Sequence, residues 1–205
     1  MVDYDPETGK VLSKITAQGY QNSSSWARGQ AWGLYAYTMC YRYTKNPIYL
    51  KQAGNIANFI ANDKRINKDR IPYWDYDAPN MPNEPKDASA AAITASALFE
   101  LSTYSDKKYF TIADEILNTL TSKEYLAEVG SNKYFILKHS VGSIPHKNEI
   151  DVPLNYADYY FMEALIKREK INQTGVQRLF LKPNLKKMNH YTGKTILKQE
   201  RQGQT

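Results

Sequence analysis

The chain has 205 residues, a length sufficient for one globular domain with a sizeable core. Of these residues, 42% are hydrophobic and 23% are charged, as is typical of a globular protein. It lacks an apolar run long enough to predict a membrane-spanning helix, and its single cysteine, Cys40, excludes an internal disulfide framework and a cysteine-based metal cluster. The net charge of +6 belongs to residues 172–205, with seven Lys or Arg side chains and one acidic side chain, so the first 171 residues are neutral overall. A neutral domain lacks the basic surface typical of nucleic-acid-binding proteins.

The N-terminal sequence MVDYDPETGK is polar and acidic and does not resemble a secretory signal. As the sequence is written we therefore expect a cytoplasmic protein, with the periplasm as the alternative for a full-length parent. The chain also contains 17 tyrosines and only six phenylalanines. Because tyrosine joins an apolar ring to a polar tip, this composition favours either half-exposed helix packing or a wet cleft such as a carbohydrate site.

The first part of the chain predicts irregular structure followed by two helices. Residues 1–22 show little apolar periodicity, and DPETGK reads as a turn. A helix is expected from about Trp26 to Tyr43, with one of the three serines before it as the N-cap. Pro47 fits the first turn of a second helix, and the expected apolar face of that helix comprises Ile48, Ala53, Ile56, Ala57 and Ile60.

A long Pro-rich loop, residues 64–86, is expected after the second helix. Its aromatic centre, Tyr73, Trp74 and Tyr76, predicts an ordered and functional loop rather than a disordered one. A third helix, rich in small residues, is expected after it and would be capped by Asp87 or Ser89.

The rest of the chain predicts two more helices and a tail. The third and fourth helices are expected to cover about 87–105 and 106–122, with loops and a short hairpin around KYFILKHSVGS between 123 and 150. The fifth helix should span roughly 153–169. We thus expect one helical domain over residues 1–170, followed by a basic and poorly ordered tail over 171–205.

The order helix, short turn, helix, long loop is typical of a helical-hairpin toroid. In such a fold, paired helices surround a central cleft, and the long loops build that cleft. An ordinary helical bundle is the alternative. In both cases the fold class is all-α.

The segment SSSWARGQAWGLYAY begins the first helix and carries the most specific chemistry. Arg28 and Trp32 lie one turn apart on the same face of a helix. A guanidinium group can bind a carboxylate with two parallel hydrogen bonds, and an indole offers a flat plate for a sugar ring. Together they predict a cradle for an acidic sugar, and Gly29 would keep its approach open. The alternative is an arginine that covers a core tryptophan.

Four segments extend this motif into a family pattern. WARGQAWGLYAYT, IPYWDYDAP, DASAAAITASALFEL and HSVGSIPHKNEIDVPLNYADYYFMEAL resemble, in this order, the unsaturated glucuronyl hydrolases of glycoside hydrolase family 88. The resemblance covers about residues 1–168 and corresponds to the C-terminal half of such a hydrolase. It implies a partial (α/α)6 barrel with about five of the usual twelve helices.

The resemblance also implies a reaction. These enzymes remove the 4,5-unsaturated uronic acid from the non-reducing end of glycosaminoglycan oligosaccharides. An aspartic acid protonates C4 of the vinyl ether and water adds at C5, which differs from attack at the anomeric carbon by paired carboxylates. The resemblance implies neither a metal nor another cofactor. Which glycosaminoglycan is cut does not follow from the sequence.

The resemblance assigns roles to six residues of this chain. Arg28 and Trp32 would bind the unsaturated uronate, and Gln18 would line the same subsite. Ser140 and Ser143 would contact a sulfate on the next sugar with help from Lys147, unless they form a plain polar loop. Other residues of the same segments have local explanations: His139 is expected to make a structural contact, Asp75 to hold a loop and Asp87 to cap a helix.

The chain departs from the family pattern where catalysis is concerned. The family's aspartic acid belongs to the N-terminal half, which this chain does not resemble, and the family's THQGY reads TAQGY here, with Ala17 in place of histidine. Residues Gln21, Asn22 and Ser23 replace an acidic pair. The expected partners are therefore an unsaturated glycosaminoglycan oligosaccharide and either a separate N-terminal half or a second copy. Two alternatives are a non-catalytic module that binds acidic oligosaccharides and a purely structural half-barrel.

Overall fold

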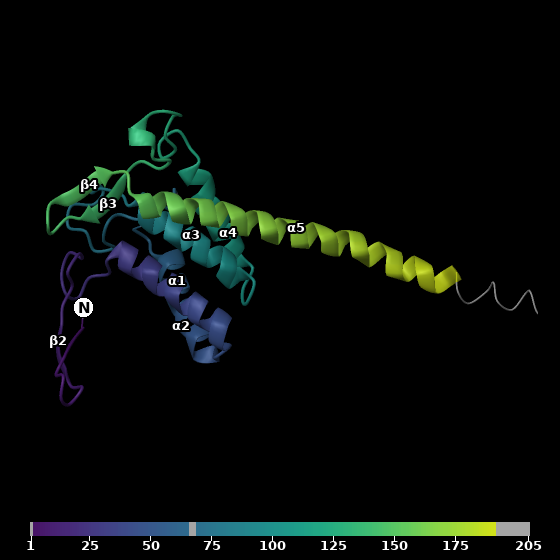
Figure 1. Ribbon diagram of the computed structural model, residues 1–205, viewed down its shortest axis with the longest axis horizontal. Helices are drawn as coiled ribbons and strands as arrows, with labels where there is room; N and C mark the ends of the chain where they lie inside the picture. The colour runs from purple at the N-terminus through teal and green to yellow at the C-terminus, as the bar shows by residue number, and fades with distance from the viewer. Residues whose placement is uncertain (1, 66–68, 192–205) are drawn as a thin grey trace, which may run out of the picture. The chain divides into compact units, whose positions relative to one another are not determined.

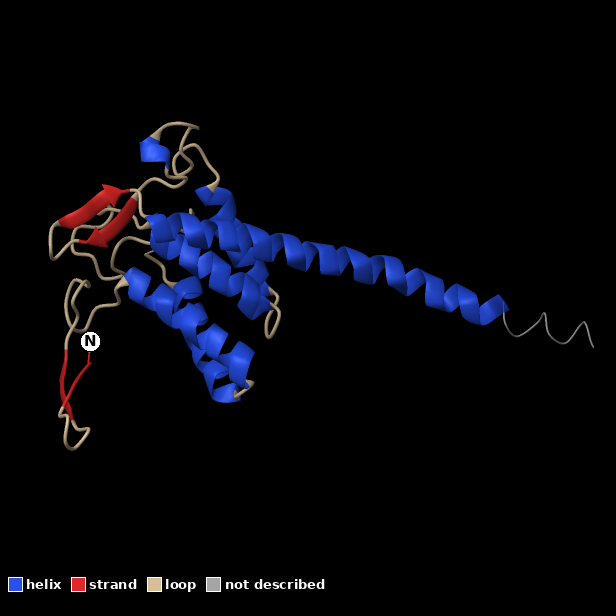
Figure 2. Cartoon of the chain, in the orientation of Figure 1, coloured by secondary structure: helices blue, strands red, loops and turns tan. Residues whose placement is uncertain are grey.

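The computed structural model describes residues 2–65 and 69–191. The chain divides into two compact units, residues 1–167 and 168–205, and all predicted site residues belong to the first unit. The described elements are five α-helices, a 3-10 turn and two hairpins (Figures 1 and 2), namely β1 (Val2–Tyr4), β2 (Val11–Lys14), α1 (Ala27–Thr44), α2 (Pro47–Asn62), α3 (Ala88–Ser102), α4 (Lys108–Leu120), the 3-10 turn Asn132–Tyr134, β3 (Ser140–Ser143), β4 (Asn148–Val152) and α5 (Asn155–Tyr191).

Helix α3 forms the centre of the first unit. All but two of its 15 residues are buried, and most of these are Ala or Ser. Small side chains allow neighbouring helix backbones to approach closely, and both α1 and α4 pack extensively against α3, while α2 packs against α1. The core is completed by larger side chains from α3 and its neighbours, among them Leu34, Ile93, Phe99, Ile116 and Leu120.

The predictions for the first four helices are confirmed to within a few residues. Pro47 occupies the first turn of α2, and Asp87 caps α3 by accepting hydrogen bonds from the backbone N–H groups of Ser89 and Ala90. The predicted serine cap of α1 is wrong, because the N-cap residue is Trp26, whose side chain makes no capping hydrogen bond. The backbone N–H of Ala27 instead donates to the carbonyl oxygen of Trp74 in the long loop.

The prediction of the apolar face of α2 is wrong at one residue, Ile48. Ala53, Ala57 and Ile60 are buried, but Ile48 is 63% exposed. Ile48 precedes Ala57 by nine residues, which is two and a half helical turns, so the two side chains lie on opposite sides of α2.

The two hairpins differ from the sequence predictions. The N-terminal segment, expected to be irregular, pairs β1 with β2, so that Val2 lies opposite Lys14. Its turn was predicted correctly: the Asp5 carboxylate accepts hydrogen bonds from the backbone N–H groups of Glu7 and Thr8. The second hairpin joins β3 to β4 and lies further along the chain than predicted, since only β3 falls within KYFILKHSVGS.

Helix α5 is longer than predicted. Its expected end near residue 169 is wrong, since the backbone stays helical to Tyr191, and residues 192–205 lie outside the described part of the chain. The predominantly helical fold is confirmed, with the two short hairpins as additions to an all-α expectation. Within the described residues, no helix combines the length and the apolar character that crossing a membrane requires.

Candidate functional site

The long loop between α2 and α3 holds the segment that precedes α1. Asp75 is fully buried, and its Oδ2 accepts hydrogen bonds from the backbone N–H of Tyr20 at 2.9 Å and from the hydroxyl of Ser24 at 2.7 Å. Its Oδ1 accepts from the backbone N–H of Asp77 at 2.8 Å. The carboxylate of Asp77 in turn accepts from the backbone N–H of Ser25. The expectation that Asp75 holds a loop is therefore confirmed.

Arg28 lies at the junction of three elements and is only 3% exposed. From the first turn of α1 it donates to the carboxylate of Asp87 at 2.9 Å, and it also donates to the carbonyl oxygens of Val141 and Gly142 in β3. Its guanidinium carbon lies 4.7 Å from the ring centroid of Trp26, in cation–π contact. Arg28 thus joins α1, the cap of α3 and β3, and in this structure its donors bind protein acceptors.

Trp32 lies one turn further along α1 in a cluster of aromatic rings. Its ring centroid is 5.1 Å from that of Tyr160 and 6.4 Å from that of Tyr156, both on α5. The ring of Tyr160 also meets Tyr35 edge to face at 5.1 Å. Trp32 remains half-buried, so part of its indole is accessible.

Gly29 has a different role from the one predicted. A β-carbon at this position would lie 2.8 Å from Cε3 of Trp26, which is closer than non-bonded carbon atoms approach. Gly29 therefore makes room for the Trp26 ring, and this ring covers Arg28. The interpretation that Gly29 keeps the approach to a ligand open is wrong.

Gln18 shares a hydrogen-bond acceptor with Arg28. Its Nε2 donates to the carbonyl oxygen of Gly142 at 3.4 Å, the same oxygen that accepts from Arg28. The residue after it, Gly19, is buried against Thr16 and Asp75, so the backbone beside Gln18 is closely packed. The structure therefore brings together Gln18, Arg28 and the β3–β4 hairpin from segments more than 100 residues apart.

The hairpin residues do not share one environment. Ser140 is fully buried, and its hydroxyl has no hydrogen-bond partner within the described structure. Ser143 is 6% exposed and its Oγ forms a hydrogen bond of 2.7 Å with Nδ1 of His146. Lys147 is exposed in the turn between β3 and β4. Ser143 and Lys147 thus share the hairpin tip, whereas Ser140 faces the interior.

Two histidines make local contacts. Nδ1 of His139 pairs with the carboxylate of Asp151 at 2.6 Å, and its ring meets Tyr125 edge to face, which confirms the structural role expected for His139. The partnership of His146 with Ser143 was not predicted, although their spacing of three residues in a tight turn could have indicated it. Across the described residues, no group of three or more His, Cys, Asp or Glu side chains is arranged to hold a metal ion.

The sequence also gave no indication of a charged network between α1, α3 and α5. The Glu163 carboxylate accepts hydrogen bonds from Ser96, from the Tyr35 hydroxyl at 3.1 Å and from Lys167 at 3.1 Å. Burial raises the pKa of Glu163, but the Ser96 hydroxyl and the Lys167 ammonium group more than offset this, so its pKa is lowered. Burial and the nearby Glu163 charge raise the pKa of Tyr35. Lys167 also pairs with Glu100 of α3 at 3.1 Å.

Comparison with known proteins shows that the chain resembles one group of enzymes. No family model matches the chain. The chain is 49% identical over 172 residues to the unsaturated glucuronyl hydrolase of Formosa agariphila, covering 83% of this chain and 43% of that protein. Its fold matches the crystal structure of an unsaturated glucuronyl hydrolase specific for heparin, with a TM-score of 0.83, 53% identity and coverage of 84% of this chain and 47% of that one.

A third relative was solved with a sugar bound. The chain matches a mutant unsaturated glucuronyl hydrolase of Streptococcus agalactiae in complex with dGlcA-GalNAc6S, with a TM-score of 0.68 and 33% identity, covering 80% of this chain and 44% of that one. The chain therefore spans less than half the length of each of these three proteins. Over that span the resemblance seen in the sequence is confirmed, and the chain is a relative of the unsaturated glucuronyl hydrolases.

Proposed function

We propose that this chain forms the substrate-binding part of an enzyme that removes a 4,5-unsaturated uronic acid from the non-reducing end of glycosaminoglycan oligosaccharides by hydration of the vinyl ether. The observation that carries the proposal is the identity of 49% over 172 residues to an unsaturated glucuronyl hydrolase, together with a TM-score of 0.83 to a solved one. The corresponding architecture is part of an (α/α)6 barrel, which the five helices and their hairpin-like order support.

The proposed subsite is built on the first turns of α1. Trp32 would offer its half-buried indole to the sugar ring. Arg28, whose charge Asp87 balances, would bind the uronate only by exchanging its contacts with the carbonyl oxygens of Val141 and Gly142. Gln18 shares the carbonyl of Gly142 with Arg28, so its amide lies beside that charge. The sulfate of a following sugar would meet Ser143 and Lys147 at the hairpin tip, while the buried Ser140 would act there only after the hairpin moves.

The proton donor is proposed to lie outside this chain. Asp75 and Asp87 are both fully buried, and each already accepts several hydrogen bonds from protein groups. A general acid has to come within hydrogen-bond distance of the carbon or oxygen that it protonates. Neither carboxylate is free to do so, and both have structural roles. The remaining part of a hydrolase of this kind would therefore supply the acid.

A second candidate function is a non-catalytic module that binds acidic oligosaccharides. The substitution of Ala17 for the histidine of the family pattern favours it, because a methyl group cannot transfer a proton or donate a hydrogen bond. Such a module would retain Arg28 and Trp32 as sugar-binding residues and would need no general acid. A purely structural half-barrel would need neither sugar-binding residues nor a general acid.

The test is the ultraviolet absorbance of the conjugated double bond in an unsaturated chondroitin disaccharide. We expect no change with this chain alone, and loss of the band when the chain is co-expressed with the part of the Formosa agariphila relative that it does not match. Substitution of Trp32 by Ala should abolish that loss. Binding without turnover in the co-expressed protein would indicate the binding module, and loss of the band with this chain alone would contradict our placement of the acid.

A further inference from the structure

Tyr156, in the first turn of α5, contacts both residues that α1 supplies to the proposed sugar subsite. Its ring centroid lies 5.5 Å from the guanidinium carbon of Arg28, in cation–π contact, and 6.4 Å from the ring centroid of Trp32. The ring is half-buried. The resemblance to the unsaturated glucuronyl hydrolases assigned no role to Tyr156, which the folded chain brings to the subsite from a distant segment.

Arg28 is held by two aromatic rings. The ring of Trp26 lies 4.7 Å from the guanidinium carbon, and that of Tyr156 completes the pair. A cation–π contact is strongest where water is excluded, and Arg28 is only 3% exposed. Such a contact uses the positive charge of the guanidinium group and none of its N–H donors. The two rings can therefore hold Arg28 whatever acceptors its N–H groups bind.

Tyr156 is itself fixed by the start of α3 and is uncharged. The Ser89 hydroxyl donates a hydrogen bond to the carboxylate of Asp87, so the hydrogen bond between Ser89 and Tyr156 has the Tyr156 hydroxyl as its donor. Burial raises the pKa of Tyr156 above its ordinary value of 10, and the positive charge of Arg28 opposes this only in part. Tyr156 is thus a neutral phenol at pH 7, and it adds no negative charge that would repel a uronate.

We propose that Tyr156 is a positioning residue that holds the guanidinium group of Arg28 at the subsite while Arg28 binds the carboxylate of the uronate. The inference rests on the proposed function of this subsite. To bind a carboxylate, Arg28 has to exchange its contacts with the carbonyl oxygens of Val141 and Gly142. The contacts with the two rings persist through this exchange because they use no N–H donor. A guanidinium group restrained in this way loses less freedom on binding, which raises its affinity for the carboxylate.

The first experiment compares two ligands by isothermal titration calorimetry. They are an unsaturated chondroitin disaccharide and its methyl ester, in which the uronate carboxylate is neutral. This chain should bind the acid more tightly than the ester. Tyr156→Leu removes the ring and should lower the affinity for the acid about threefold to tenfold, with little change for the ester. Tyr156→Phe retains the ring and should keep the preference for the acid, whereas a merely structural role of Tyr156 would weaken the binding of both ligands alike in Tyr156→Leu.

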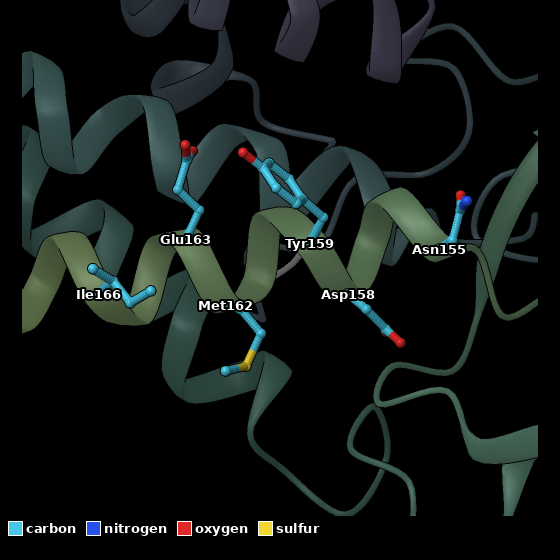
Figure 3. Close-up of a pocket in the computed structure, with 6 residues that line it drawn as sticks. All are labelled: Asn155, Asp158, Tyr159, Met162, Glu163 and Ile166. Atoms are coloured by element: carbon cyan, nitrogen blue, oxygen red, sulfur yellow. The ribbon is translucent and has the colours of Figure 1, made fainter.

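The second experiment tests the contact without a sugar, by labelling with the arginine reagent phenylglyoxal. Mass spectrometry should show faster modification of Arg28 in Tyr156→Leu than in the parent or in Tyr156→Phe, because one of the two rings no longer covers the guanidinium group. Tyr159→Leu is the matched control and should label like the parent. Tyr159 lies on the same helix, is 60% exposed, and meets the ring of Tyr160 at 4.9 Å. Figure 3 shows Tyr159 among the side chains that line a shallow hollow on α5, and neither Arg28 nor Trp32 lines that hollow.

Two results would overturn the inference. One is an unchanged rate of Arg28 labelling in Tyr156→Leu, and the other is an equal loss of affinity for the acid and the ester in that variant. Circular dichroism should show every variant folded, and Tyr156→Met replaces the leucine variant if the latter is unfolded. Failure of the proposed function would look different. The parent would then bind neither ligand, or bind both equally, while loss of the Tyr156 ring still accelerated the labelling of Arg28.

Discussion

The positively charged side chain of Arg28 is buried, with only 3% of the residue exposed. Hydrogen-bond acceptors of the protein therefore replace the water that would solvate its guanidinium group. Asp87 balances the charge, while the carbonyl oxygens of Val141 and Gly142 accept its remaining hydrogen bonds. Asp87 also caps α3 and accepts a hydrogen bond from the backbone N–H of Val141. One ion pair therefore fixes the start of α1, the start of α3 and β3.

Substitution of Arg28 by Ala should lower the free energy of unfolding by about 3–5 kcal/mol, because the buried carboxylate of Asp87 would lose its counter-charge. Urea unfolding followed by circular dichroism measures the change. Arg70→Ala is the control, since Arg70 pairs with Glu115 at the surface, where such a pair contributes about 1 kcal/mol or less. If the two variants lost the same free energy of unfolding, the buried Arg28–Asp87 pair would stabilise the protein no more than a surface pair does.

At the scale of elements, the segment before α1 depends on a loop 50 residues further along the chain. Asp75 accepts hydrogen bonds from Tyr20 and Ser24, and Asp77 accepts one from Ser25. These contacts fix the backbone that carries Gln18 toward the β3–β4 hairpin. The long loop is therefore a scaffold for the proposed subsite rather than a source of ligand contacts.

Replacement of Asp75 by Asn should loosen this segment. An asparagine side chain has one acceptor oxygen where aspartate has two, so its NH2 group would face hydrogen-bond donors that now bind a carboxylate oxygen. We expect the free energy of unfolding to fall by about 1–3 kcal/mol. Hydrogen–deuterium exchange followed by mass spectrometry should show faster exchange in residues 18–26. Asp106→Asn, at the exposed start of α4, should leave the exchange of those residues unchanged. Unchanged exchange in Asp75→Asn would mean that other contacts hold the segment.

The sequence predicted those elements whose signals are local. Pro47 and Asp87 mark the starts of α2 and α3, and apolar periodicity supports the helices that follow them. The hairpins were harder to predict, because their strands have three to five residues, and β3 is held by a distant contact between the Val141 N–H and Asp87.

The same distinction holds for the candidate site. Helical spacing correctly placed Arg28 and Trp32 one turn apart, and the local motif correctly made Asp87 a helix cap. The pairing of Arg28 with Asp87 connects residues 59 positions apart, and no local pattern indicates it. For the same reason, the sharing of the Gly142 carbonyl by Gln18 and Arg28 became visible only in the folded chain.

At the scale of the whole first unit, the Glu163 network joins the N-terminal half of α5 to α1 and α3. Its members come from all three helices: Tyr35 from α1, Ser96 and Glu100 from α3, and Lys167 from α5. Because the pKa of Glu163 is lowered in the folded chain, its ionised form stabilises that chain. This stabilisation is present above the ordinary carboxyl pKa of 4.5 and is lost as the pH falls through the lower pKa of the folded state.

The substitution Glu163→Gln should therefore destabilise the protein in a manner that depends on pH. At pH 7 we expect a loss of about 1–2 kcal/mol in the free energy of unfolding, because Tyr35, Ser96 and Lys167 lose a charged acceptor. The difference between the two proteins should shrink as the pH falls below 4.5 and through the lowered pKa of Glu163, where the parent's carboxylate becomes protonated. Asp5 and Asp63 also have lowered pKa values, but they are present in both proteins and cancel in the comparison.

Urea unfolding at a series of pH values, followed by circular dichroism, measures this difference. Glu115→Gln provides the matched control, because Glu115 is a carboxylate 46% exposed that pairs with Arg70 at the surface. Its effect should stay small at every pH, as expected for an exposed pair. If the loss caused by Glu163→Gln were the same at pH 3 as at pH 7, the ionised carboxylate would not be what holds α5 against α1 and α3.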